Sequence, residues 1–215
     1  MNTKYSYRYE DKGIYCYDGS DVLINKLFIK NEASFDMAER LFSGLRQSQL
    51  MEKPLAGKFD FNHLKAIHRY LFQDLFNWAG KIRTVAIAKE SMFCLPQYIE
   101  LYAKDVFVKL RQNKYLQGLE EDAFIDQLVE LLADINALHP FREGNGRTQR
   151  EFIRYIAGIN GYGLDWSLVN SDENIVASHE SVNGNNEKLK VLISKILYPL
   201  TKEEKRVFEK VFLNK

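Results

Sequence analysis

The chain has little of what marks secreted, membrane or nucleic-acid-binding proteins. Its 215 residues include only two cysteines and four prolines. Cys16 and Cys94 lie far apart and form no metal or redox motif, which favours reduced thiols. No apolar run approaches the ~20 residues of a membrane helix, and the N-terminus has no hydrophobic signal region. A formal net charge of +1 creates no overall field toward nucleic acid. We therefore expect a cytoplasmic protein without membrane or direct nucleic-acid partners.

The same scarcity of proline, with no low-complexity tract, argues against an interdomain linker. A chain of 215 residues is long enough for one domain with a full-sized core. We predict a single domain over residues 1–215. It consists of a tyrosine-rich extended arm over residues 1–21 and a core over about residues 22–200.

Apolar periodicity predicts that most of the chain is helical. One or two helices are expected over residues 25–49, and further helices over residues 60–72, 96–112, 120–138, 146–160 and 188–200. Asp60 is the expected N-cap of the second segment. Alternating β-branched residues over 82–88 predict one strand, in a two-stranded hairpin. The predicted fold class is all-α, a helical bundle with one short β-hairpin.

Residues 139–150 read His-Pro-Phe-Arg-Glu-Gly-Asn-Gly-Arg-Thr-Gln-Arg and suit the binding of a polyphosphate. A Gly-Asn-Gly turn at a helix start lets backbone N–H groups converge on an anion. Arg147 and Arg150, three residues apart on one helical face, can bind phosphate oxygens together. Glu143 is an oxygen ligand of the kind that Mg²⁺ takes beside phosphates. His139 can accept a proton near neutral pH.

The other histidines give weaker signals. His63 and His68 are five residues apart on one helix, off the spacing of a zinc pair, and His68 is expected to be a core residue. His179 lies in a polar stretch, residues 178–186, that is expected to be a surface loop.

Residues 139–150 also resemble the signature of the Fic family, His-x-Phe-x-Asp/Glu-Gly-Asn-Gly-Arg-x-x-Arg, at every defined position. Residues 17–27, 67–72 and 78–84 resemble Fic segments too, so the resemblance covers about residues 15–200. It is closest to the toxin-type bacterial Fic proteins. These enzymes transfer AMP from ATP to a hydroxyl side chain of a target protein.

The resemblance, together with the residue chemistry, implies a role for each motif residue. His139 is the expected catalytic base, Glu143 the ligand of Mg²⁺ or Mn²⁺, and Arg147 and Arg150 the partners of the β- and γ-phosphates. Asn145 would orient the α-phosphate, and Phe141 would anchor the loop in the core. The full predicted set of ATP- and phosphate-binding residues is Phe141, Arg142, Glu143, Gly144, Asn145, Gly146, Arg147 and Arg150.

A second implied element is a flap that clamps the target segment by strand addition. The predicted flap residues are Val85, Ala86, Ile87, Ala88 and Lys89.

Gly146 stands where the kinase-like Doc branch has lysine, which favours transfer of AMP over transfer of the γ-phosphate. Phosphocholine transfer, as in other family members, stays a rarer alternative. So do an AMP-removing or nucleotide-hydrolysing enzyme and a non-catalytic binding module.

The resemblance implies two partners. One is a target protein, which by likeness would be a type II DNA topoisomerase subunit. The other is a small antitoxin. The antitoxin is expected because the family's inhibitory motif, Ser/Thr-x-x-x-Glu-Gly/Asn, is not matched. Ser6 to Glu10 and Ser48 to Glu52 have its spacing, but the next residue is wrong in both cases. An inhibitory glutamate would then come from a separate chain.

Overall fold

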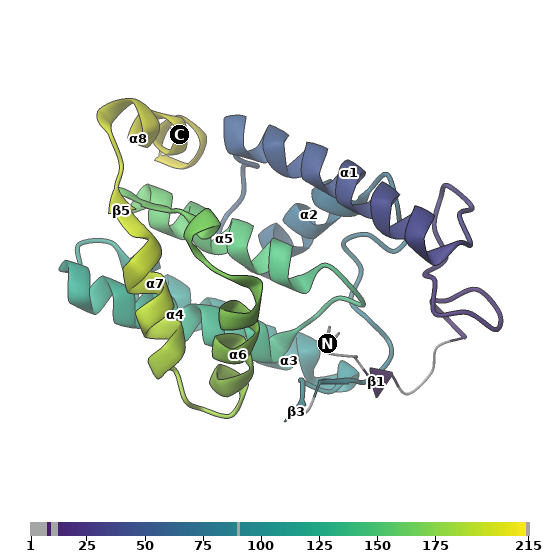
Figure 1. Cartoon of the computed structure of the whole chain (residues 1–215). Helices are drawn as coiled ribbons and strands as arrows, with labels where there is room; N and C mark the ends of the chain where they lie inside the picture. The colour runs from purple at the N-terminus through teal and green to yellow at the C-terminus, as the bar shows by residue number, and fades with distance from the viewer. Residues whose placement is uncertain (1–7, 10–12, 90, 214–215) are drawn as a thin grey trace.

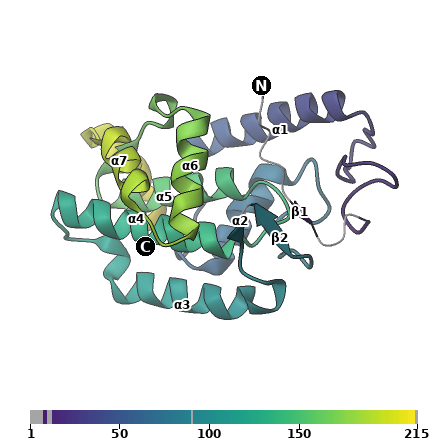
Figure 2. The ribbon, with the colours of Figure 1, turned by 60° about the horizontal axis from the view of Figure 1, so that its bottom comes forward.

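A computed structural model describes residues 8–9, 13–89 and 91–213 of the chain. Helices dominate these residues, and Figure 1 shows α5 (Asn145–Ile159) in the middle of the molecule. On one side of α5 lie α1 (Glu32–Glu52) and α2 (Phe61–Phe72). On the other side lie α4 (Glu121–Leu138), α6 (Ser171–Val182) and α7 (Glu187–Ile196). In the turned view, α3 (Ile99–Gln112) runs beneath α4 (Figure 2). A short α8 (Lys202–Phe208) packs on α5.

The strands are short and form two antiparallel sheets. In the first, β2 (Ile87–Lys89) lies between β1 (Arg8–Tyr9) and β3 (Ser91–Met92). Arg8 pairs with Ala88, and Ala88 also pairs with Met92. In the second sheet, β4 (Tyr162–Leu164) pairs with β5 (Leu197–Pro199). Short 3-10 turns cover Pro96–Tyr98, Lys114–Leu116 and Trp166–Leu168, and a π-helical turn covers Glu209–Leu213.

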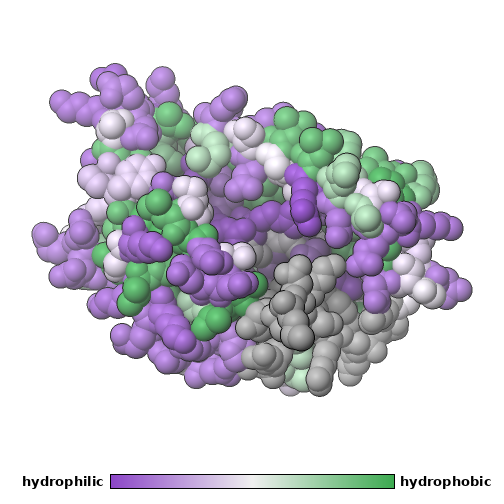
Figure 3. All heavy atoms as spheres, viewed as in Figure 1, coloured by the Kyte–Doolittle hydropathy of each residue, from purple (hydrophilic) through white to green (hydrophobic). Residues whose placement is uncertain are grey.

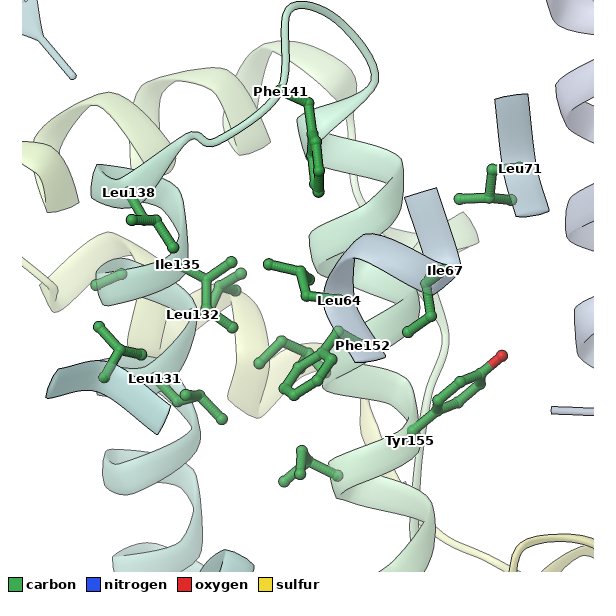
Figure 4. Close-up of a cluster of buried hydrophobic side chains, with 14 of the residues drawn as sticks. Leu64, Ile67, Leu71, Leu131, Leu132, Ile135, Leu138, Phe141, Phe152 and Tyr155 are labelled. Atoms are coloured by element: carbon green, nitrogen blue, oxygen red, sulfur yellow. The ribbon is translucent and has the colours of Figure 1, made fainter. Parts of the chain in front are cut away.

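The core forms where α2 and α4 pack against α5. Phe152, Ile156 and Leu64 are fully buried, and Figure 4 shows side chains of the three helices meeting in one cluster. The loop that joins α4 to α5 contributes Phe141 to the same cluster. The segment that carries the candidate site is therefore packed directly on the core.

Helix α2 follows its sequence pattern closely. The Asp60 carboxylate caps the helix by accepting a hydrogen bond from the His63 N–H at 2.8 Å. Leu64, Ile67 and Leu71 form one apolar stripe that is buried against α5. The predicted helix over residues 60–72 is confirmed.

Four predicted details are corrected by the structure. Helix α1 begins only at Glu32, later than the predicted start near residue 25, and its apolar residues Met37 and Leu41 are exposed. The strand predicted over residues 82–88 covers only Ile87–Lys89; it forms the predicted hairpin with β3, and β1 adds a third strand on its other side. The segment predicted as a loop at residues 178–186 belongs in part to α6. The last predicted helix ends at Ile196, since residues 197–199 pair with β4.

The predicted extended arm lies only partly within the described residues. Arg8–Tyr9 is an extended strand, and residues 13–21 form turns that end near an isolated bridge between Cys16 and Leu23. The rest of the arm lies outside the described residues. Across the described parts of the chain, we find no helix with the length and apolar character needed to cross a bilayer.

Candidate active site

His139 lies at the point where α4 ends. Its backbone is left-handed, with a φ of 41°, and its N–H still donates to the Ile135 carbonyl at 3.1 Å. Pro140 cannot continue the helix, so the chain turns away immediately after the histidine. The His139 ring stacks on Phe93, with ring centroids 3.7 Å apart, and Nδ1 lies 3.3 Å from the Asn136 carbonyl oxygen. A carbonyl only accepts, so Nδ1 carries the proton, and a neutral ring has its lone pair on Nε2.

The loop after His139 is closed by Asn145. The Asn145 Oδ1 accepts from the Phe141 N–H at 2.9 Å, and Nδ2 donates to the Phe141 carbonyl at 2.7 Å. The Phe141 side chain is buried in the core, where sequence reasoning placed it. Both polar atoms of the Asn145 side chain bind main-chain groups, which leaves the second N–H of Nδ2 for the predicted contact with a phosphate.

His68 of α2 packs against the loop that joins α4 to α5. Its ring stacks on Phe141 at a centroid distance of 3.8 Å, and Nε2 lies 2.9 Å from the Glu143 carbonyl oxygen. Nδ1 accepts from the Gly80 N–H at 2.7 Å, which places the ring proton on Nε2. Burial lowers the pKa of His68 to about 3, so the ring is neutral. The prediction of a core histidine is confirmed, and its hydrogen bond to the motif loop was missed.

The N-terminus of α5 has the geometry of an anion-binding turn. Gly144 has a φ of +80°, and a Cβ there would lie 2.3 Å from the Phe72 ring, so glycine is required for two reasons. The Gly144 N–H donates to the Glu143 carboxylate at 2.9 Å. The N–H groups of Asn145, Gly146 and Arg147 fall in the first helical turn, where no intrahelical acceptor exists. This turn offers donors and partial positive charge to a phosphate.

The two motif arginines have different surroundings. Arg147 makes an ion pair with Glu39 and donates from Nη1 to the Ser43 hydroxyl at 2.7 Å. Among the described residues, no carboxylate contacts Arg150, whose guanidinium lies 5.7 Å from the centre of the Trp166 ring. Burial and the nearby Arg147 charge lower the pKa of Arg150.

Arg142 does not face the anion-binding turn. Its side chain is buried, with Nη2 3.7 Å from the Cys16 Sγ and its guanidinium over the Tyr15 ring. The predicted contact of Arg142 with nucleotide is therefore not supported for its side chain.

A cavity of about 200 Å³ opens between His139, the start of α5 and α6. Asn136, Gly146 and Arg150 contribute polar groups, while Leu132 and Ile175 form apolar walls. Hydrophilic side chains line the hollow that lies below α1 and beside α6 in Figure 3. Residues 174–182 of α6 were missed as site residues. Their mixed polar sequence gives a weak helical period, and only the packing of α6 on α4 places them here.

The flap residues lie beside His139. Val85 is buried, and residues 87–89 form β2. Both edges of β2 are occupied, by β1 and by β3. The predicted strand addition of a target segment to β2 would therefore have to displace β1 or β3.

Arg83 links the predicted flap to the loop that follows α4. Its guanidinium is almost fully buried and donates from Nε to the His139 carbonyl at 2.8 Å and from Nη1 to the Val85 carbonyl at 2.7 Å. Nη2 donates to the Cys94 carbonyl. Burial lowers the pKa of Arg83 to about 10, so the side chain stays cationic. Sequence reasoning missed this role, because local patterns do not indicate which carbonyl groups a buried arginine binds.

The described residues include no cluster of three His, Cys, Asp or Glu side chains that could hold a metal ion. The motif offers the single half-buried carboxylate of Glu143. One carboxylate with phosphate oxygens and water is an ordinary ligand set for Mg²⁺. The donor set therefore fits a metal ion that arrives with a nucleotide.

Comparison with known proteins identifies the family. Residues 58–157 match the Fic/DOC family. The chain is 41% identical over 181 residues to the protein adenylyltransferase VbhT of Bartonella schoenbuchensis, covering 84% of this chain and 38% of that protein. It is 33% identical over 189 residues to the probable protein adenylyltransferase Fic of Escherichia coli, covering 87% of this chain and 94% of that one.

A solved structure has the same fold. The BepC protein of Bartonella tribocorum with bound AMPPNP superposes with a TM-score of 0.81 at 26% identity, over 87% of this chain and 98% of that one. The chain belongs to the Fic/DOC family.

Proposed function

We propose that this protein is an adenylyltransferase that moves AMP from ATP to a Ser, Thr or Tyr hydroxyl of a target protein. One observation carries the proposal. The His139 ring, the N-terminus of α5 and Arg150 border one cavity that is large enough to admit part of a nucleotide. The names of the relatives and the AMPPNP bound in BepC support the same reaction.

In the proposed complex, the triphosphate lies over the first turn of α5. The N–H groups of this turn bind phosphate oxygens, Arg147 lies at the β-phosphate and Arg150 at the γ-phosphate. The adenosine end enters the cavity between α4 and α6, where Leu132 and Ile175 offer apolar contacts. Glu143 would hold Mg²⁺, which supplies charge neutralisation at the phosphates when bound.

Catalysis then depends on His139. Its Nε2 lone pair takes the proton from the target hydroxyl as the hydroxyl oxygen forms a bond to the α-phosphorus. The bond between the α-phosphorus and the bridging oxygen breaks, and pyrophosphate leaves with the electron pair. Arg147 and the N–H groups of the helix turn stabilise the charge that develops on it.

The flap is the proposed binding surface for the target. An extended target segment would take the place of β1 along Ile87 and Ala88 and present its hydroxyl beside His139. By family likeness, the target is a type II DNA topoisomerase subunit.

A small antitoxin remains the proposed regulator, which makes this chain the toxin of a toxin–antitoxin pair. Arg150 borders a second hollow of about 380 Å³ between α1 and Trp166, lined by small or flexible side chains such as Gly44 and Ser48. A glutamate inserted there would pair with Arg150 and exclude the γ-phosphate. Of the two partial inhibitory motifs, Glu52 is exposed at the end of α1, and Glu10 lies outside the described residues.

The test is a reaction of the purified chain with ATP labelled in the α-phosphate, in bacterial lysate. Label on a protein supports a transferase, label in free AMP indicates a hydrolase, and absence of turnover indicates a binding module. Mass spectrometry of the labelled protein identifies the target. Excess EDTA and Glu143→Ala should each abolish labelling, and full activity in EDTA would overturn the assignment of Glu143. Activity of the chain without any partner is the outcome expected if inhibition comes from a separate antitoxin.

A further inference from the structure

Two side chains of α1 contact Arg147, the first of the two arginines that the family signature defines. Glu39 and Ser43 are four residues apart, so they lie on the same face of the helix. Glu39 forms an ion pair with Nη2 of Arg147, and the Ser43 hydroxyl accepts from Nη1 at 2.7 Å. The Phe72 ring of α2 lies on another side of the guanidinium, with its centre 4.8 Å away. Three contacts from two helices thus fix the position of Arg147.

The inward-facing side of α1 is polar where the helix borders the site. The Ser43 side chain is buried, and the Glu39 side chain is only 14% exposed. The apolar neighbours Met37, Leu41 and Leu45 instead point to solvent, where hydrophobic side chains gather along α1 in Figure 3. A largely buried carboxylate is costly unless it is paired. Among the described residues Arg147 forms the ion pair with Glu39, so it offsets the cost of burying this carboxylate.

The contact geometry is better suited to holding Arg147 in place than to blocking its access to a phosphate. Glu39 and Ser43 each engage a different nitrogen of the guanidinium, and neither contact is bidentate. A guanidinium carries more N–H donors than these two contacts use, so donors remain for a phosphate. The carboxylate also offsets part of the repulsion between Arg147 and Arg150, which stand on neighbouring turns of α5.

We propose that Glu39, assisted by Ser43, is a positioning residue for AMP transfer that holds the Arg147 guanidinium ready for the departing pyrophosphate. This inference rests on the proposed function. A cation fixed before the substrate arrives stabilises developing charge without reorganising during the reaction. The opposite role, in which Glu39 competes with phosphate for Arg147 and restrains activity, predicts the opposite change on mutation.

The experiment compares purified full-length variants in two assays. One measures the rate of protein labelling from α-labelled ATP in lysate, and the other measures the affinity for MgAMPPNP by calorimetry. Glu39→Gln keeps the size of the side chain and removes its charge. Ser43→Ala provides a second, milder variant, and Glu52→Gln, at the exposed end of the same helix, is the matched control.

We expect Glu39→Gln to lower the labelling rate at saturating ATP by roughly 10- to 100-fold, the usual cost of losing a partner that orients a functional group. MgAMPPNP affinity should change much less, because the pyrophosphate charge develops only as the bond breaks. Ser43→Ala should show a smaller loss of the same kind, and Glu52→Gln should show none.

A cycle with Arg147→Ala separates positioning from a general structural effect. In that background, Glu39→Gln should cause little further loss, since the group that it positions is gone. An equal further loss, or faster labelling by Glu39→Gln alone, would overturn the proposal. If Glu39→Gln fails to fold, the same cycle with Ser43→Ala decides. If the wild type binds MgAMPPNP but labels no protein, the proposed function fails instead, and the two failures are thereby distinguished.

Discussion

The two walls of the active site are built differently. On the wall formed by α1 and α2, Arg147 is held by a carboxylate, a hydroxyl and an aromatic ring. On the wall formed by α6 and the turn at Trp166, Arg150 contacts no carboxylate among the described residues and borders two hollows. The first wall is complete before a nucleotide binds, whereas the second offers space and an uncompensated cation. The comparison suggests that one arginine is fixed for chemistry and the other is left accessible to the substrate or a regulator.

The largest effect is expected at His139, which lies where the two walls meet. His139→Ala removes the proposed base, and general base catalysis contributes roughly 10²–10⁴-fold to rate. MgAMPPNP affinity should be nearly unchanged, because the ring is not among the proposed phosphate ligands. The rate of labelling from α-labelled ATP, with affinity by calorimetry, checks this prediction. Labelling by the variant at a wild-type rate would refute the proposed mechanism.

A smaller effect is expected from adding charge beside Arg150, on the wall of the site that offers space. Gly146 is exposed, and a Cβ there would lie 3.4 Å from Nη1 of Arg150, so a side chain fits with little adjustment. Gly146→Lys places a second cation beside Arg150 and should weaken AMP transfer by altering how the triphosphate lies. Gly146→Ala is the neutral control and should retain most of the activity. The assay compares label transferred from the α- and γ-phosphates, and unchanged α-label transfer by Gly146→Lys would contradict the assignment of this turn.

The smallest effect concerns the free energy of unfolding and its dependence on the protonation of His68 of α2. The pKa of His68 falls from an ordinary 6.5 to about 3 because the ring is buried, so the folded state binds fewer protons than the unfolded state. Its contribution is complete above pH 6.5 and is lost as pH falls from there toward 3. The free energy of unfolding should drop by about 1.4 kcal/mol per pH unit for this one group.

Urea unfolding at several pH values within that window measures the slope. Burial also lowers the pKa of His63, so the wild type should lose stability through both rings. His68→Gln is the informative variant, because an amide can both donate and accept as the ring does. It should reduce the pH dependence of stability by the share of one group. An unaltered slope in this variant would show that His68 titrates normally.

Sequence reasoning succeeded where the relevant contacts are short-range. The residues of the motif are contiguous, so their order already implied a helix end, a turn and a helix start. The Asp60 cap was found for the same reason. Contacts between distant segments were missed. Glu39 lies more than a hundred residues before Arg147. Apolar periodicity predicted a helix here, but Met37 and Leu41 face solvent, so the pattern did not indicate which side of α1 faces the site. The polar sequence of α6 hid its place in the cavity wall until its packing was known.

The buried Arg83 constrains which parts of this site could change in sequence. Its planar guanidinium binds carbonyl groups of three separate segments, and one of them is the carbonyl of His139, the proposed base. Lysine has a single ammonium and could not reach three carbonyls set in those directions. The flap sequence can therefore drift as targets change, provided that its two ends remain attached to this side chain. If the flap binds targets as proposed, recognition could diversify while Arg83 keeps His139 in place.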